Sequence, residues 1–325
     1  QMQANPQMAQ PQMQANPQMA QPQMQQPYMM PAPNMAVQPA QFQTFNQEIS
    51  PLLQQENIDF ELIIADDASE NNLFTEISEL LKKYEFNDFI FINNSKNTGT
   101  VINCCNALNK SSGEYVLFIS PGDYLADNDV LNGLYNFSKK NKYLITFGKP
   151  VCYNLNNNGE IQIFDNIKIP LHPEYFSDEY SIKFQKLMFF YNNYILGPCY
   201  FRERNTALKY FNIIKEHCKY VEDNTSTAFA LMDGVKLNYY KSNIIYYEYG
   251  TGVSTSKSQE WKRILEKDFE NNFSALKKKY PNDRIVDFFY NKNKIKRVIK
   301  HPIISLIILK MKLFRVIEGR KNAGS

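Results

Sequence analysis

The pattern of apolar and polar residues over residues 60–119 predicts three strands and two helices. Continuous apolar runs at Phe60–Ala65, Phe89–Ile92 and Tyr115–Ile119 have the length and composition of buried strands. Between them, apolar residues recur at helical spacing over Leu73–Tyr84 and Thr100–Asn109. This alternation predicts an α/β fold with an open, mostly parallel sheet flanked by helices.

The second half of the chain is less regular but continues the mixture of helices and strands. Helices are predicted over Ser181–Asn193, Glu222–Met232 and Trp261–Lys279, and the small, polar residues of Gly250–Ser258 predict a loop. Short strands are predicted over Leu144–Phe147, Ile161–Phe164, Val235–Tyr240 and Ile244–Tyr247.

The N-terminal segment differs in composition from the rest of the chain. Residues 1–43 are almost entirely Gln, Met, Pro, Ala and Asn, the sequence QMQANPQMAQP occurs twice in succession, and no charged residue precedes Glu48. Such a segment cannot bury enough apolar surface to offset its conformational entropy, so we expect a disordered tail. It would act as a flexible spacer or, alternatively, as an interaction module. The chain then divides into this tail, a domain over residues 44–280 and a basic, apolar extension over residues 281–325, which we expect to be helical.

Charge separates the C-terminal extension from the domain. Residues 292–321 carry ten Lys or Arg and one acid, Glu318, whereas the rest of the chain has a net charge of −6. An acidic domain gives little support to nucleic-acid binding. The interleaved basic and apolar residues of the extension favour attraction to an anionic membrane surface, although its apolar run Pro302–Leu309 is too short to span a bilayer. The alternative is a helix packed on the domain.

The cysteines indicate the compartment. The five cysteines form no CxxC pair and no recognisable disulfide framework, and no signal peptide is visible. We therefore expect a cytoplasmic protein that binds peripherally at the inner face of the membrane.

Acidic residues follow the predicted strands. Asp66 and Asp67 end the first strand, Asp123 follows the third, and Glu222 and Asp223 open a later helix. In an open α/β sheet the ligand binds in a crevice at the carboxyl ends of the strands, so this edge is where we expect the site.

Three segments resemble the family 2 glycosyltransferases of the GT-A fold, in particular those of bacterial surface-polysaccharide synthesis. They are Phe60–Asn71 (FELIIADDASEN), Asn97–Leu125 (NTGTVINCCNALNKSSGEYVLFISPGDYL) and Val221–Gly234 (VEDNTSTAFALMDG). The family has Asp-Asp-x-Ser after a strand, Asn-x-Gly before a helix, a Gly-Glu-Tyr strand leading to an acidic motif, and a later Glu-Asp pair. The resemblance implies transfer of a sugar from a nucleoside diphosphate donor, expected to be UDP-linked, to a glycan or a lipid-linked acceptor by an inverting reaction.

The resemblance also implies which residues bind the donor. An acid at a strand end can accept hydrogen bonds from the base or the ribose, although two acids can also simply cap a turn. The residues before Thr44 form a poor buried strand, so either Gln41–Phe45 fills the position of the family's first strand weakly or the repeats have replaced it. The donor-binding residues that the resemblance implies are Asp66, Asp67, Ser69, Asn97, Gly99, Thr44 and Asn46.

The catalytic residues implied are Asp223 as base and Glu222 as its orienting partner. An inverting transfer needs a carboxylate that deprotonates the acceptor hydroxyl. A divalent ion, Mn²⁺ or Mg²⁺, normally neutralises the leaving diphosphate. The family usually shows D-x-D-D where this chain has Ser120–Asp123 (SPGD), so Asp123 is the expected metal ligand. Loss of the other acids motivates an alternative, in which a catalytically inactive GT-A-like domain serves as a binding or scaffold module.

Overall fold

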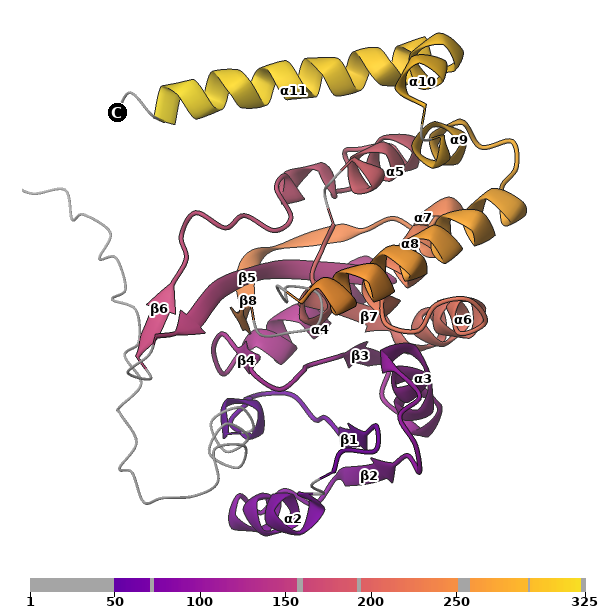
Figure 1. Cartoon of the computed structure of the whole chain (residues 1–325). Helices are drawn as coiled ribbons and strands as arrows, with labels where there is room; N and C mark the ends of the chain where they lie inside the picture. Colours follow the sequence, from indigo (N-terminus) through magenta and orange to yellow (C-terminus); the bar gives the residue numbers. More distant parts are fainter. Residues whose placement is uncertain are drawn as a thin grey trace, which may run out of the picture. The chain divides into compact units, whose positions relative to one another are not determined.

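The computed structural model describes residues 50–70, 73–156, 160–191, 194–250, 258–291 and 293–322 (Figure 1). The predicted tail over residues 1–43 lies outside the described residues. So do Thr44, Asn46 and most of the predicted loop Gly250–Ser258.

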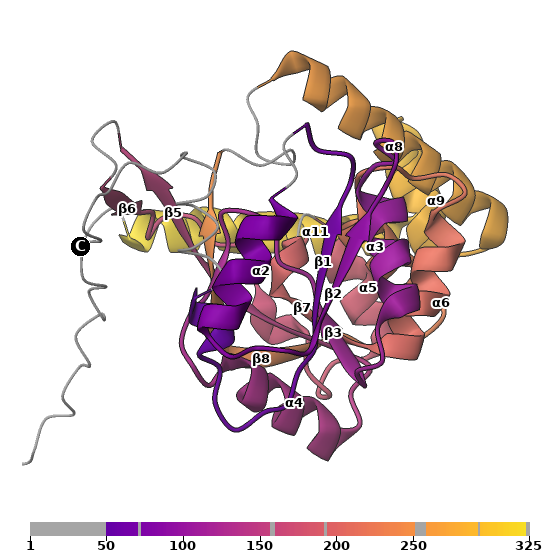
Figure 2. The same ribbon diagram turned by 90° about the horizontal axis from the view of Figure 1, so that it is seen from below.

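The first predicted strands and helices are confirmed. β1 (Leu62–Asp66) pairs in parallel with β2 (Phe89–Asn93) in a two-stranded sheet. Figure 2 shows α2 (Phe74–Lys83) and α3 (Thr100–Lys110) on opposite sides of this sheet. The buried face of α2 packs against side chains of both strands because its apolar residues recur every three or four positions. The residues of this face are Ile77, Leu80 and Leu81.

A second sheet has six strands, and its directions correct the sequence prediction. Along the sheet the order is β3, β7, β5, β8 and β4, and β6 adds to β5. β5 and β8 run parallel, whereas the pairs β3–β7, β5–β7, β4–β8 and β5–β6 are antiparallel, so the prediction of a mostly parallel sheet was wrong. An apolar run that is buried on both faces reads the same in either direction, so the pattern could not reveal strand direction. The strands are β3 (Tyr115–Leu117), β4 (Tyr124–Leu125), β5 (Ile145–Leu155), β6 (Ile161–Ile163), β7 (Tyr200–Glu203) and β8 (Asn238–Glu248).

β8 joins two strands that were predicted separately. It continues through the polar residues Lys241–Asn243 because the backbone keeps pairing with β5 across a register shift at Phe147–Pro150. Such an irregularity bends the strand locally and lets one long strand carry a polar interruption.

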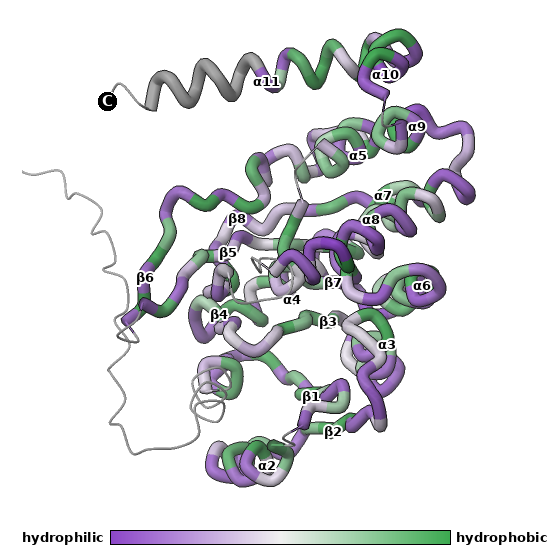
Figure 3. The backbone as a smooth tube through the Cα atoms, viewed as in Figure 1, coloured by the Kyte–Doolittle hydropathy of each residue, from purple (hydrophilic) through white to green (hydrophobic). Residues whose placement is uncertain are grey.

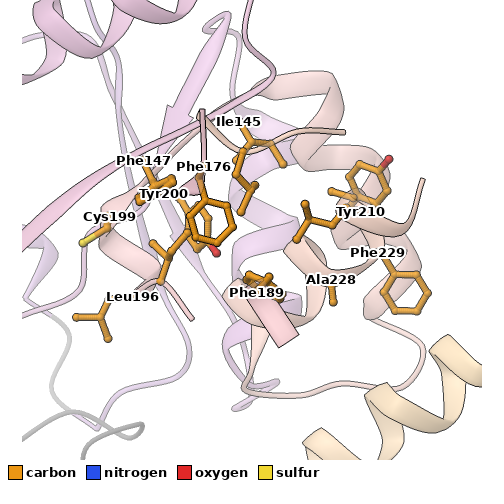
Figure 4. Close-up of a cluster of buried hydrophobic side chains, with 14 of the residues drawn as sticks. Ile145, Phe147, Phe176, Phe189, Leu196, Cys199, Tyr200, Tyr210, Ala228 and Phe229 are labelled. Carbon is orange, nitrogen blue, oxygen red and sulfur yellow. The ribbon is translucent and has the colours of Figure 1, made fainter. Parts of the chain in front are cut away.

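The main core lies between the six-stranded sheet and the helices that cover it. α7 (Glu222–Met232) is buried from Thr225 to its end, and its side chains meet aromatic residues of the sheet and of neighbouring helices (Figure 4). Among the largest side chains of this core are Phe147, Phe176, Tyr200, Tyr210, Phe211 and Phe229. The surrounding helices are α4 (Val130–Asn141), α5 (Ile182–Phe190), α6 (Arg204–Ile214) and α8 (Gln259–Lys279).

Three helices form the C-terminal extension. α9 (Arg284–Tyr290) packs on α5 and α8, and α10 (Lys294–Lys300) leads into α11 (Pro302–Asn322) at the outer edge of the domain (Figure 1). The helical character predicted for this extension is therefore confirmed.

The two sheets are separate in the described part of the chain. β1 pairs with β2 along one edge, and no described strand pairs with its other edge. Its residues are half-buried throughout, although their apolar character suits full burial. Gln41–Phe45, one of the two alternatives for the family's first strand, falls outside the described residues.

Candidate active site

Asp67 ties together the loop that follows β2. Its carboxylate accepts hydrogen bonds from the backbone N–H of Thr98 at 2.9 Å and of Gly99 at 2.7 Å, from the Thr98 hydroxyl at 2.7 Å, and from the Asn94 amide at 3.0 Å. Partial burial raises the pKa of Asp67, but the hydrogen bonds from Thr98, Asn94 and Gly99 outweigh burial and leave the pKa lowered. In this structure both carboxylate oxygens are engaged by the protein itself.

Asp66 is less constrained than Asp67. Its carboxylate oxygens accept a hydrogen bond from the backbone N–H of Ser69 at 3.1 and 3.3 Å, which shapes the turn after β1. Ser69 and Asn97 are exposed on the two loops at this end of the sheet. Of the two acids, Asp66 therefore has the greater capacity to accept hydrogen bonds from a ligand, and donor binding by these residues remains a prediction.

Gly99 joins this loop to the segment before the acid pair. Its φ of +88° suits glycine, and a Cβ atom there would lie 2.4 Å from the Cγ of Lys219 and 2.9 Å from the Lys219 carbonyl oxygen. The Val101 N–H donates to the same carbonyl at 3.0 Å. The predicted donor loop and the chain leading to Glu222 are thus in direct contact.

A buried acid of α8 also binds the backbone of the segment just before Glu222. The carboxylate of Asp268 accepts hydrogen bonds from the backbone N–H groups of Lys219 at 3.0 Å and Tyr220 at 2.6 Å, and the ring of Trp261 meets that of Tyr220 edge-on at 5.1 Å. Asp268 was not predicted as a site residue, because an acid inside a long charged helix is typical of a solvent-exposed surface.

The acid pair at the start of α7 has perturbed acidity. Burial, followed by the charge of Asp223, raises the pKa of Glu222 to about 8. Burial also raises the pKa of Asp223, while the backbone N–H of Asn224, which donates at 2.5 Å, and the charge of Arg202 oppose the rise. Since hydrogen bonds from Asn224 stabilise the charge of Asp223, Asp223 is the better candidate for the carboxylate of the pair.

Two residues that surround this pair were not assigned to it from the sequence. A Cβ atom on Gly197 would lie 3.3 Å from Oε1 of Glu222 and 3.7 Å from Oδ2 of Asp223, so a side chain at this position would press on the pair. Arg202, which is 3% exposed, stacks 3.9 Å over the Tyr200 ring and donates to the Thr227 hydroxyl at 3.3 Å. Its Nε has no hydrogen-bond partner among the described residues. An arginine inside the apolar strand β7 was the available sequence signal.

Asp123 lies in a tight turn beside β8. It is 3% exposed, and its carboxylate accepts a hydrogen bond from the Ser120 N–H at 3.2 Å. Gly122 has a φ of +93°, and a Cβ atom there would lie 2.6 Å from an Oε2 of Glu248. Glu248, the last residue of β8, was also missed as a site residue.

Asp123 and Asp223 both influence the acidity of one buried thiol, that of Cys199. Burial, and then the negative charges of Asp123 and Asp223, raise the pKa of Cys199. Asp123 and Asp223 are therefore both close enough to the turn Gly197–Cys199 to act on the same thiol.

A divalent ion would need more ligands than Asp123 alone. Among the described residues, no group of three or more His, Cys, Asp or Glu side chains is arranged to hold a metal ion. Mg²⁺ and Mn²⁺ are commonly held by one or two carboxylates together with substrate phosphates. The carboxylate of Glu248 lies beside the turn of Asp123, and metal binding at Asp123 stays a prediction.

Comparisons with known proteins confirm the resemblance. Residues 43–201 match the family model described as Glycosyl transferase family 2. A 92-residue stretch is 36% identical to the poly(ribitol-phosphate) beta-glucosyltransferase of Bacillus spizizenii, and this stretch covers 28% of this chain and 14% of that enzyme.

The fold also matches solved structures. S. aureus TarS 1-349 in complex with UDP-GlcNAc aligns with a TM-score of 0.55 and 16% identity, over 78% of this chain and 68% of that one. Another crystal structure of S. aureus TarS 1-349 aligns with a TM-score of 0.53 and 15% identity, over 80% of this chain and 69% of that one. At this identity the alignment shows the fold, which is the α/β GT-A fold of glycosyltransferases.

Proposed function

With residues 43–201 matching a family 2 glycosyltransferase domain, we propose that the chain transfers a sugar from a UDP-sugar to a hydroxyl of a glycan or a lipid-linked acceptor, with inversion. The observation that carries this proposal is the acid pair Glu222–Asp223. It opens a buried helix, has raised pKa values, and faces Gly197, which has no side chain to press on it.

The choice of donor rests on relatives. The complex of TarS contains UDP-GlcNAc, and the Bacillus enzyme is named for a β-glucosyl product. Formation of a β-linkage from an α-linked UDP-sugar inverts the anomeric carbon. The TarS complex therefore supports a UDP-sugar donor, and the name of the Bacillus enzyme supports a β-linked product. The name of the Bacillus enzyme also supports a polymeric polyol phosphate as one acceptor class to test.

The geometry suggests how the residues divide the work. Asp223 removes the proton of the acceptor hydroxyl as the new glycosidic bond forms, while protonated Glu222 keeps a second negative charge away from the base. Asp67 holds the Thr98–Gly99 loop in place, and Asp66 accepts hydrogen bonds from the nucleoside. A divalent ion bound at Asp123 would neutralise the charge of the departing diphosphate.

The inactive scaffold is the second candidate. It is favoured by the segment Ser120–Asp123 (SPGD), which keeps only Asp123 of the acids that the family usually shows there, and by the lack of a three-ligand metal group among the described residues. A scaffold needs neither turnover nor a base with tuned acidity.

A donor screen by calorimetry, with and without Mn²⁺, separates the two candidates when it is paired with a transfer assay. We expect one UDP-sugar to bind and to be consumed in the presence of acceptor. Asp223→Asn should bind that donor with similar affinity and lose transfer by at least about 1000-fold, the loss expected when a general base is removed. Undiminished transfer by Asp223→Asn refutes the assignment of the base, and binding of no donor supports the scaffold.

A further inference from the structure

The outer side of α10 and α11 presents large apolar side chains to solvent. We call this surface the apolar face. Its six aliphatic residues are 54–75% exposed, and they recur at spacings of three or four along the two helices, so they lie on a continuous side of each helix. The apolar face consists of Ile295, Val298, Ile299, Ile303, Leu306 and Leu309.

The opposite side of α11 is the one that packs on the domain. Ile304 and Ile308 are each 9% exposed and belong to the main core. The helix break at His301 is held by a hydrogen bond to Asp287 at 2.8 Å. α11 is thus apolar on two opposite sides, and hydrophobic residues are frequent along its described start (Figure 3). A helix that is apolar on two sides is normally covered on both.

Charge identifies what covers the second side. Four exposed lysines, Lys294, Lys296, Lys310 and Lys312, border the apolar face, and no described ion pair holds them. No acidic residue occurs between residues 292 and 312. Apolar side chains flanked by unpaired lysines match the boundary between the headgroups and the acyl chains of an anionic bilayer, where lysine stems let the ammonium groups reach phosphates.

We propose that the apolar face inserts into the headgroup layer of an anionic membrane and holds the domain at the membrane surface. α11 then lies in the plane of the membrane, with Ile304 and Ile308 still packed on the domain. None of the helices within the described residues is both long and apolar enough to cross a bilayer. Binding is therefore reversible, depends on anionic lipid and weakens as salt screens the lysines.

Co-sedimentation with vesicles tests this proposal without donor or acceptor, so its outcome is independent of the proposed activity. The full chain should sediment with phosphatidylglycerol-containing vesicles and remain in solution with phosphatidylcholine alone. The triple variant Ile299→Ser/Ile303→Ser/Leu306→Ser should bind at least about 100-fold more weakly, because three exposed aliphatic side chains no longer leave water.

A matched control replaces three exposed aliphatic side chains on a different surface of the domain. Leu155, Ile161 and Ile163 on the β5–β6 hairpin are 45%, 62% and 46% exposed, and their triple change to Ser should leave vesicle binding unchanged. Circular dichroism of both triple variants establishes that each remains folded.

The lysines are tested separately. Changing Lys294, Lys296, Lys310 and Lys312 to Gln should weaken binding by about 100-fold or more at low salt, since each cation near an anionic surface contributes about fivefold.

Three results would overturn the proposal. The first is no sedimentation with anionic vesicles. The second is binding that the apolar triple variant retains in full, which would leave a purely electrostatic attachment. The third is a dimer in sedimentation velocity that the triple variant dissociates while the parent ignores vesicles, which would make the apolar face an interface between two copies of the chain.

Discussion

Glu222→Gln should stabilise the protein at alkaline pH, because the raised pKa of Glu222 makes this residue a cost to folding. The unfolded chain releases the Glu222 proton near its usual pKa of 4.5, whereas the folded protein keeps it until about pH 8. Between these values the folded state binds more protons than the unfolded state, so stability falls as the pH rises. Below pH 4.5 Glu222 is protonated in both states, so this cost to folding is absent.

The size of the effect follows from the width of this interval. At 1.36 kcal/mol per pKa unit, an interval from 4.5 to about 8 corresponds to roughly 5 kcal/mol. Asp223 shares part of the interaction, so we expect Glu222→Gln to raise the free energy of unfolding by about 2–4 kcal/mol at pH 9. At pH 4.5 the two proteins should differ by less than about 1 kcal/mol, since Gln has nearly the shape of the protonated acid.

Urea unfolding of both proteins at pH 4.5, 7 and 9 measures the difference. Asp67→Asn is the matched control of opposite sign, because the pKa of Asp67 is lowered in the folded protein. The charged Asp67 carboxylate stabilises the folded protein above pH 3.8, the pKa of the unfolded chain. This stabilisation is lost as the pH falls through the lower pKa of the folded protein. Asp67→Asn should therefore destabilise the protein at neutral pH, by about 1–3 kcal/mol, since Asn leaves at least one donor of the Thr98–Gly99 loop unpaired. Parallel stability profiles of parent and Glu222→Gln would refute the raised pKa.

Further predictions concern the site and the tail. Gly99→Ala should destabilise by about 1–3 kcal/mol in urea unfolding and weaken donor binding, since its Cβ would meet the Lys219 carbonyl oxygen at a positive φ. Asp123→Ala should weaken UDP binding in calorimetry chiefly when Mn²⁺ is present, and equal weakening without the ion would exclude a ligand role. Arg202→Met should shift the acid limb of the transfer pH profile upward, because loss of a nearby positive charge raises the pKa of the base, whereas Arg202→Lys should keep the profile near that of the parent. Deleting residues 1–33 should leave the urea midpoint unchanged, since an uncharged Gln/Pro repeat contributes no core, and a lower midpoint would show that the tail packs.

Local patterns in the sequence predicted the elements well where one period dominated. α7 begins and ends where predicted, and β2, α2 and α3 agree to within one residue or two. The pairing of strands was harder to predict, because it depends on contacts between segments far apart in the chain. β7 enters between β3 and β5 from about 85 residues after β3, and nothing in its four residues indicates that position.

The candidate site shows the same difference between local motifs and contacts between distant segments. The acid pair, the Asp-Asp end of β1 and Gly99 could be found because each lies in a short motif. Arg202, Asp268 and Glu248 could not, since each acts through a contact with a distant segment. Isolated charged residues in an apolar strand, in a charged helix or at a strand end have many explanations until the fold brings them to the motifs.

The position of α8 links stability to the proposed chemistry. Asp268 accepts hydrogen bonds from two backbone N–H groups just before Glu222, and the same segment receives the Val101 N–H through the Lys219 carbonyl. The segment is therefore fixed from one side by α8 and from the other by the donor loop. A ligand that orders the donor loop would stiffen the segment carrying the proposed base through these contacts alone. The raised pKa of Glu222 shows that burying the acid pair costs stability. The hydrogen bonds to Asp268 and to the Lys219 carbonyl offset this cost by holding the segment in place.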